Sequence, residues 1–347
     1  MKSPTKKTGL IRNQILKDVV LHSHDIASHI ASLFDITRQS VNKHIRALID
    51  DGYIEASGST RARTYKLGVK RSLSIRLNLE GLSEHDVYTK YFGHITEGLA
   101  KNVEDIVFYG FTEILNNAID HSDALSCSIK MERNEKELFI SITDYGEGIF
   151  KRICRLMSLD DEAQALLELS KGKLTTDPEN HSGQGIFFTS RSFDYFVIHS
   201  FDQVFKHDHQ IDVDLLVQDF DDNKTIEGTR ILMGISLGSE RTLNSVFDDY
   251  SAGEDGDYAF NRTVIPVRLA KYGTEQLVSR SQAKRVLSRI DNFKFVVMDF
   301  DQVEAVGQAF ADEIFRVYTQ RCPDINISFC NASDRVRQMI LRANPDA

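Results

Sequence analysis

The chain has 347 residues, 41% of them apolar, so it can form two or three folded domains and its composition excludes wholesale disorder. Its net charge is −9, yet residues 1–68 hold 11 basic and 6 acidic residues and carry +5, which leaves −14 elsewhere. This asymmetry indicates one part that faces a polyanion and excludes a chain that is basic throughout.

Cysteine usage and hydropathy bear on the compartment. The four cysteines form no Cys-x-x-Cys pair, which favours buried reduced thiols. No apolar run resembles a signal peptide, and none approaches the ~18 residues of a membrane helix. We therefore expect a cytoplasmic protein that does not engage a membrane.

Residues 9–68 show three short helical patterns followed by a basic hairpin from Ile54 to Leu67. Apolar residues at helical spacing predict one buried face on each of the last two helices. These residues are Ile26, Ala27, Ile30 and Leu33 in the second helix, and Val41, Ile45, Leu48 and Ile49 in the third. Gly52 is placed to end the third helix.

The opposite face of the third helix is polar and basic, which suits base edges and phosphates in a DNA major groove. With the preceding turn Asp35-Ile-Thr, this run resembles the winged helix-turn-helix domains of bacterial regulators, over residues 1–70. The resemblance implies double-stranded DNA as a partner; a protein-interaction domain with a solvated polar face is the alternative. The implied DNA-binding residues are Arg38, Gln39, Asn42, Lys43 and Arg46, with Arg61 and Arg63 in the hairpin.

The segment Phe111–Ser122 carries a polar stripe within an apolar helical pattern. Glu113, Asn117 and His121 are four residues apart and share one helix face. A hairpin of strands at 127–131 and 138–143 follows and delivers Asp144 in the sequence Asp-Tyr-Gly-Glu-Gly. A long polar stretch, 151–182, is expected to be a flexible lid.

Two further pieces complete the series. The loop Ser182-Gly-Gln-Gly opens an apolar helix over 186–193, and Glu227-Gly-Thr leads into an alternating strand over 230–237. In this order the motifs resemble the Bergerat-fold (GHKL) ATPases, which include histidine kinases, gyrases and anti-sigma-factor kinases. The resemblance covers residues 83–238 and implies ATP and Mg²⁺ as cofactors.

The resemblance also implies roles at the catalytic end of the site. The Asn117 carbonyl would hold Mg²⁺, and Glu113 would orient or deprotonate an attacking water. His121 either closes the phosphate side or caps local packing, and Lys173 is either a lid cation or an exposed side chain.

At the base end, Asp144 and Thr229 would receive the adenine amine, while Gly146 and Gly148 would let the backbone approach the base. The loop of Ser182, Gly183, Gln184 and Gly185 would offer amide groups to phosphate.

An acidic stretch over 239–262, rich in turn formers, is expected to be a linker. Strands and helices then alternate over 263–347, which fits a small α/β domain. The runs Phe293–Val303 and Phe310–Val317 resemble the STAS-like family. The turn Glu304–Ala309 lacks the phosphorylatable hydroxyl that STAS antagonists of anti-sigma factors carry at this place, which argues against regulated phosphorylation of this domain. Asp312, Glu313 and Arg316 form either a partner surface or a solvated ion-paired face.

Together these patterns predict an α+β chain of several domains: a winged helix, a central α/β sandwich of the Bergerat type and a STAS-like domain. The expected function is that of an ATP-binding transcription regulator, which hydrolyses ATP slowly or only senses it, with an unknown protein partner at the STAS-like domain and homodimers. The alternative is a serine/threonine kinase of the anti-sigma type that acts on a partner protein.

Overall fold

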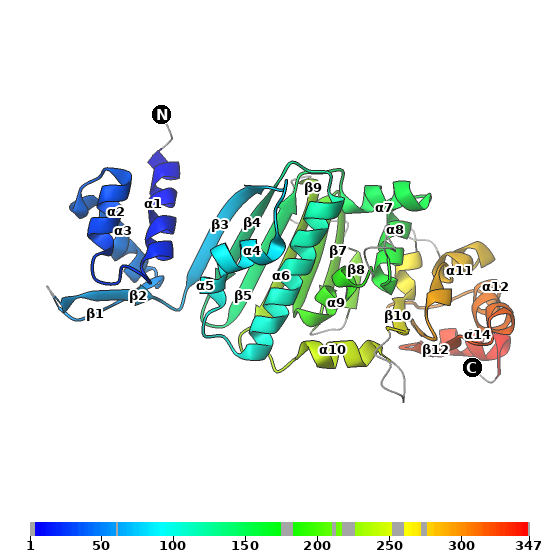
Figure 1. Ribbon diagram of the computed structural model, residues 1–347. Coiled ribbons are helices and arrows are strands. Elements are labelled where there is room, and N and C mark those ends of the chain that lie inside the picture. Colours follow the sequence, from blue (N-terminus) through cyan, green and yellow to red (C-terminus); the bar gives the residue numbers. More distant parts are fainter. Residues whose placement is uncertain are drawn as a thin grey trace.

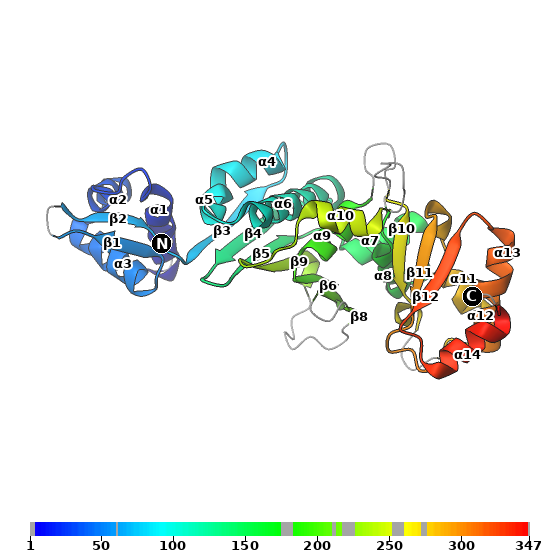
Figure 2. The same ribbon diagram turned by 90° about the horizontal axis from the view of Figure 1, so that it is seen from below.

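The computed structural model describes residues 4–59, 62–174, 183–209, 213–216, 226–251, 260–271 and 276–345. They form an elongated molecule, with a small helical unit at the N-terminal end, a large sheet in the middle and a small sheet at the C-terminal end (Figures 1 and 2). The mixture of helices with several sheets agrees with the predicted α+β class.

The N-terminal unit consists of three helices and a hairpin. Its elements are α1 (Pro4–Asp18), α2 (Ile26–Phe34), α3 (Arg38–Asp50), β1 (Ile54–Ser57) and β2 (Thr64–Leu67). The apolar face of α3 is buried as predicted, but Leu33 of α2 is 56% exposed, because the turn at Asp35 redirects the chain at the end of that helix. Gly52 ends α3 with φ +81°, and its N–H donates to the Ile49 carbonyl.

The central sheet has seven antiparallel strands in the order β3-β4-β5-β9-β6-β7-β8. They are β3 (Arg71–Asn78), β4 (Ser126–Arg133), β5 (Glu137–Asp144), β6 (Tyr195–Phe201), β7 (Gln203–Asp208), β8 (Val213–Leu216) and β9 (Ile226–Ser236). The predicted hairpin and last strand correspond to β4, β5 and β9. The sheet also takes in β3, which lies before the expected domain start at residue 83.

Helices cover one face of this sheet (Figure 2). They are α4 (Glu84–Val87), the π-helical turn η2 (Tyr88–Phe92), α5 (Gly93–Thr96), α6 (Lys101–His121), α9 (Gly185–Ser192) and α10 (Leu243–Tyr250). Apolar residues of α6 and of the inward sheet face, such as Phe111 and Ile140, belong to one buried core. Gly110 lets α6 and α9 pack closely, since a Cβ there would lie 2.3 Å from the Phe193 ring.

Two segments that were expected to be loops are helical. The described part of the predicted lid forms α7 (Ile149–Met157) and α8 (Glu162–Lys171), and residues 165–171 are all buried. Within the predicted linker, α10 begins with a capping box between Thr242 and Ser245. The charged residues of both segments hide short helical patterns, so these helices were not expected. The roles of the two segments as a lid and as a linker stay predictions.

The C-terminal part is a three-stranded parallel sheet, β10 (Arg262–Pro266), β11 (Phe295–Asp299) and β12 (Asn326–Cys330), in that order. Between and after the strands lie α11 (Arg280–Val286), α12 (Gln308–Asp312), the π-helical turn η5 (Glu313–Tyr318), α13 (Thr319–Arg321) and α14 (Asp334–Ala343).

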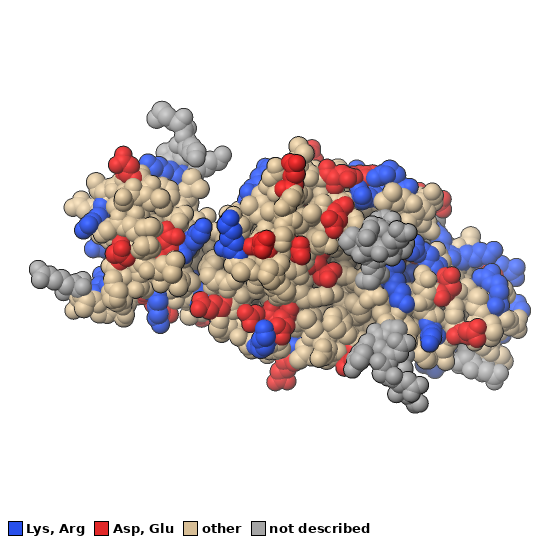
Figure 3. Space-filling view, in the orientation of Figure 1, with Lys and Arg blue, Asp and Glu red and all other residues tan. Residues whose placement is uncertain are grey.

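Basic side chains gather at this end of the molecule, whereas acidic ones are spread over its middle (Figure 3). Arg316 pairs with Asp312, while Glu313 is buried and therefore does not belong to a solvated face.

Fewer cysteines are buried than the sequence predicted. Cys127 is buried, whereas the thiols of the other three cysteines are partly exposed. Within the described part of the chain, no helix combines the length and the apolar character that crossing a bilayer requires.

The close contact at Gly110 predicts that any side chain at this position disturbs the packing of α6 on α9. Gly110→Ala should lower the free energy of unfolding by about 1–3 kcal/mol, because the added methyl group overlaps the Phe193 ring. Urea unfolding measures the change. The control is Gly9→Ala in α1, where a Cβ would meet no atom within 4 Å and the substitution should be neutral or stabilising. Equal effects at both positions would contradict the proposed packing.

Candidate functional site

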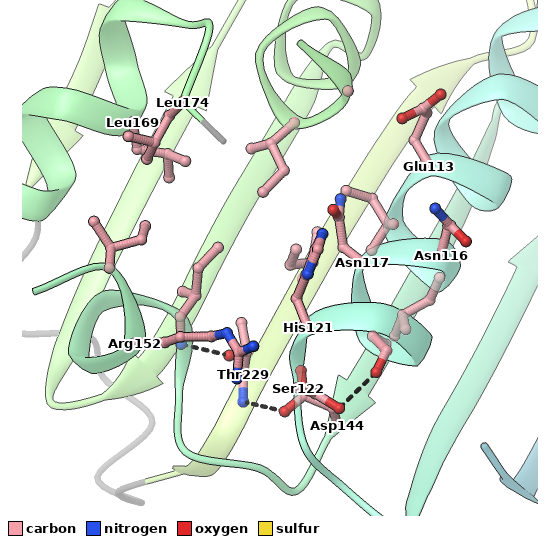
Figure 4. Close-up of a pocket in the computed structure, with 18 of the residues that line it drawn as sticks. Glu113, Asn116, Asn117, His121, Ser122, Asp144, Arg152, Leu169, Leu174 and Thr229 are labelled. Carbon is pink, nitrogen blue, oxygen red and sulfur yellow. Dashed lines mark hydrogen bonds between the residues drawn. The ribbon is translucent and has the colours of Figure 1, made fainter. Parts of the chain in front are cut away.

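The polar stripe of α6 faces a pocket between this helix, the sheet and α7 to α9. Glu113, Asn117 and His121 all line it, as the spacing predicted. Figure 4 shows them projecting from one side of α6, with Leu169 and Leu174 across the cavity. The space between these walls, counted together with the open solvent at its mouth, is about 1170 Å³. Its lining combines apolar walls with a few polar groups, as small-molecule sites do.

Asp144 and Thr229 meet at the floor of the pocket because β5 pairs with β9 at these two residues. Asp144 is 8% exposed, and its Oδ1 accepts hydrogen bonds from the Gly146 amide at 3.0 Å and the Thr229 amide at 3.2 Å. The Thr229 hydroxyl accepts from the Ile149 amide at 2.9 Å. Burial raises the pKa of Asp144, and the hydrogen bonds oppose that shift. The Asp144 carboxylate thus joins strands β5 and β9, and the Thr229 hydroxyl joins strand β9 to the start of helix α7.

The glycines after Asp144 make room for protein neighbours. A Cβ on Gly146 would lie 1.8 Å from the Ser122 carbonyl oxygen, and one on Gly148 would lie 2.6 Å from the Ser200 hydroxyl. Gly148 lines the pocket, whereas Gly146 is absent from the described lining. Gly146 therefore packs closely against the end of α6, and its predicted role beside a base stays a prediction.

The second glycine loop lies against Glu113. Gly183 and Gly185 both line the pocket, and Gly183 has φ +68°. A Cβ on Gly185, the first residue of α9, would lie 2.0 Å from Glu113 Oε2. Gln184 is the N-cap residue of α9 and makes no side-chain capping bond, and Ser182 lies outside the described residues. The start of α9 is thereby held directly beside the carboxylate of α6.

Lys173 does not join this site. Its ammonium group donates to the Asn292 carbonyl at 2.7 Å and lies 4.7 Å from the centre of the Phe293 ring, both in the C-terminal part. The Lys173 side chain thus contacts the C-terminal part, although the neighbouring Leu174 lines the pocket, and its role as a lid cation stays a prediction.

Sequence reasoning missed Arg152 and an apolar wall. Arg152 lines the pocket from α7 and pairs with Asp123. Leu169 and Leu174 line the pocket across from α6, and Phe187 of α9 also contributes to the lining. Extending the helical period beyond Gly148 would have placed Arg152 one turn into α7. The leucines were hidden in the polar stretch that was interpreted as a flexible lid.

The predicted DNA-binding side chains of α3 lie at the far end of the molecule. All of them are exposed, and so is Arg63, which lies over the Tyr65 ring at 5.5 Å. Arg61 lies outside the described residues. The exposed α3 residues are Arg38, Gln39, Asn42, Lys43 and Arg46.

Comparison with known families identifies one part of the chain. Residues 282–337 match a STAS-like domain of unknown function (DUF4325). The match runs from α11 into α14, so the C-terminal part is STAS-like, as its sequence indicated. A search of the curated proteins found no match to the chain.

The floor of the pocket predicts a stability effect that does not depend on any ligand. Thr229→Val should lower the free energy of unfolding by about 1–3 kcal/mol, because it leaves the Ile149 amide without its acceptor. Thr229→Ser retains the hydroxyl and serves as the control. Urea unfolding of both variants decides the matter, and a valine variant as stable as wild type would refute the role of the hydroxyl.

Proposed function

We propose that the protein is an ATP-binding transcription regulator in which the nucleotide state of the central domain controls the binding of DNA or of a protein partner. The observation that carries the proposal is the convergence of three distant segments on one pocket. The polar stripe of α6, the Asp144–Thr229 pair and the glycine loop before α9 all line it. These are the motifs whose order resembles the Bergerat-fold ATPases.

The floor of the pocket suits a purine base. Asp144 is a buried acceptor that is held in place by two backbone amides, so it can receive an exocyclic amine. Ile149, Ile153 and Ile231 give the same region apolar walls. A carboxylate at an apolar floor favours a ligand with a planar apolar face and one amine, which describes adenine.

The other end of the pocket suits phosphates and Mg²⁺. The amides of Gly183 and Gly185 lie at the start of α9, where backbone N–H groups attract anions. The Asn117 carbonyl and the Glu113 carboxylate offer oxygen atoms beside them. Such a sparse oxygen donor set fits Mg²⁺, which commonly takes one or two protein ligands together with phosphate oxygens. Bound there, the ion would neutralise phosphate charge, while Glu113 would orient a water.

The binding of DNA is proposed for the N-terminal unit, which would be a winged helix with α3 as the recognition helix. Its exposed face offers arginine, glutamine and asparagine side chains for base edges. Only residues 68–70 separate β2 from β3, so this unit is attached directly to the edge of the central sheet. A short connection of this kind would let a change in the sheet reposition the DNA-binding surface.

Calorimetric titration with an ATP analogue and Mg²⁺ tests the pocket. Wild type should bind, and Asp144→Asn should bind roughly 10- to 150-fold more weakly, because it loses a charged hydrogen-bond acceptor. Asp120→Asn, an exposed position on the same helix α6, is the matched control and should not change the affinity. If wild type binds no adenosine phosphate, the proposed function is wrong.

Fluorescence anisotropy with random-sequence duplex DNA tests the N-terminal unit. Arg38→Ala and Arg46→Ala should each weaken binding, and wild-type affinity should fall steeply with salt because neutralised phosphates release counterions. Lys136→Ala removes the same charge from the β4–β5 turn, which lies outside the N-terminal unit, and should leave binding unchanged. Loss of binding in the Lys136 variant alone would assign DNA contact to another surface.

A further inference from the structure

The segment from Leu169 to Leu174 belongs to two parts of the molecule at once. Leu169 and Leu174 line the pocket, whereas Lys171 and Lys173 between them contact the STAS-like domain. Gly172 lies at the junction with φ +79°, and a Cβ there would come within 2.8 Å of the Phe260 ring and 3.0 Å of the Phe187 ring. The two leucines at the ends of this short segment therefore face the cavity, and the two lysines between them face the C-terminal domain.

Lys171 is the centre of the contact with the C-terminal domain. The side chains of Lys171 and Glu168 are 2% and 1% exposed, and they pair at 2.8 Å. The Lys171 ammonium group also donates to the Arg285 carbonyl at 3.3 Å, in the last turn of α11, and to the Ser288 carbonyl at 2.8 Å, just beyond the end of that helix. In return, the Thr263 hydroxyl of β10 donates to the Lys171 carbonyl at 2.7 Å.

A buried charge of this kind needs all of its partners. An ammonium group without water is tolerated only when it is paired and hydrogen-bonded, and the carbonyls of residues 285 and 288 supply bonds that α8 cannot make by itself. If the STAS-like domain moved away, Lys171 would keep Glu168 but lose both carbonyls. The position of α8 therefore depends on the docked domain.

Two further contacts connect the pocket wall with the same domain. Phe187, which lines the pocket, packs on Phe260 with ring centres 4.9 Å apart, and Phe260 packs on Phe293 at 5.3 Å. The Arg289 guanidinium donates to the Met157 sulfur at 3.4 Å on α7, the helix that also brings Arg152 to the pocket. Arg289 has φ +60°, a conformation that only surrounding contacts can maintain in a residue with a side chain.

We propose that the STAS-like domain completes the ligand site: docked through Lys171, it holds the outer wall of the pocket, so that ligand binding and domain docking form one coupled equilibrium. The nature of the ligand, an adenine nucleotide, rests on the proposed function. Because coupling is reciprocal, a nucleotide in the pocket tightens the docking of the domain to the same extent that docking tightens nucleotide binding. The STAS-like domain thereby senses whether the pocket is filled.

Full-length variants test the coupling. Lys171→Met alone would leave Glu168 buried without its partner, so the principal variant is the double substitution Glu168→Leu with Lys171→Met, which removes both charges. The control is Lys101→Met, which breaks an exposed ion pair of the same i,i+3 spacing with Glu104. For each protein, calorimetry measures the affinity for an ATP analogue with Mg²⁺, and hydrogen exchange measures amide protection over residues 285–293.

The expected result is about tenfold weaker nucleotide binding in the double variant, with faster exchange over 285–293. In wild type the nucleotide should slow exchange over the same residues, and the control should match wild type. Faster exchange without any change in affinity would overturn the coupling, and unchanged exchange would overturn the docking role of Lys171. If wild type itself binds no nucleotide, the proposed function fails, and the coupling to a nucleotide falls with it. The exchange data then report separately whether Lys171 docks the domain.

Discussion

The pairing of β5 with β9 brings Asp144 next to Thr229, 85 residues away in the chain, and the candidate site is built around this contact. A carboxylate that is so deeply buried persists only if it is hydrogen-bonded, and the Gly146 and Thr229 amides satisfy that requirement. The Thr229 hydroxyl then positions the start of α7 through the Ile149 amide. The strand register thus determines the floor of the pocket and the place where its next wall begins.

Close packing determines the remaining walls. Because helices cover one face of the central sheet, α6 buries its apolar side on the strands and presents Glu113 and Asn117 to the cavity (Figure 4). Gly185 allows α9 to begin against the Glu113 carboxylate, and Gly172 allows α8 to meet the aromatic side chains beside the STAS-like domain. At both places a side chain would separate the elements that enclose the pocket, so packing and ligand recognition depend on the same glycines.

The parts of the site that were predictable from sequence are those carried by local patterns. The four-residue spacing on α6, the hairpin that ends at Asp144 and the glycine loop before α9 all reach the pocket. Helix α8 could not be predicted, because the Glu168–Lys171 pair gives a buried helix the composition of an exposed one, and its partner carbonyls lie more than a hundred residues later. For the same reason the contact of Lys173 with the Asn292 carbonyl could not be predicted, and the sequence left this residue either as a lid cation or as an exposed side chain.

Photoaffinity labelling with an azido-adenine analogue of ATP tests most directly the claim that these segments form one adenine-nucleotide site. The reactive group lies on the base, so the labelled peptides should contain residues 144–153 and 226–231, and unlabelled ATP should suppress the labelling. Labelling confined to other peptides, or labelling that excess ATP does not reduce, would contradict the claim.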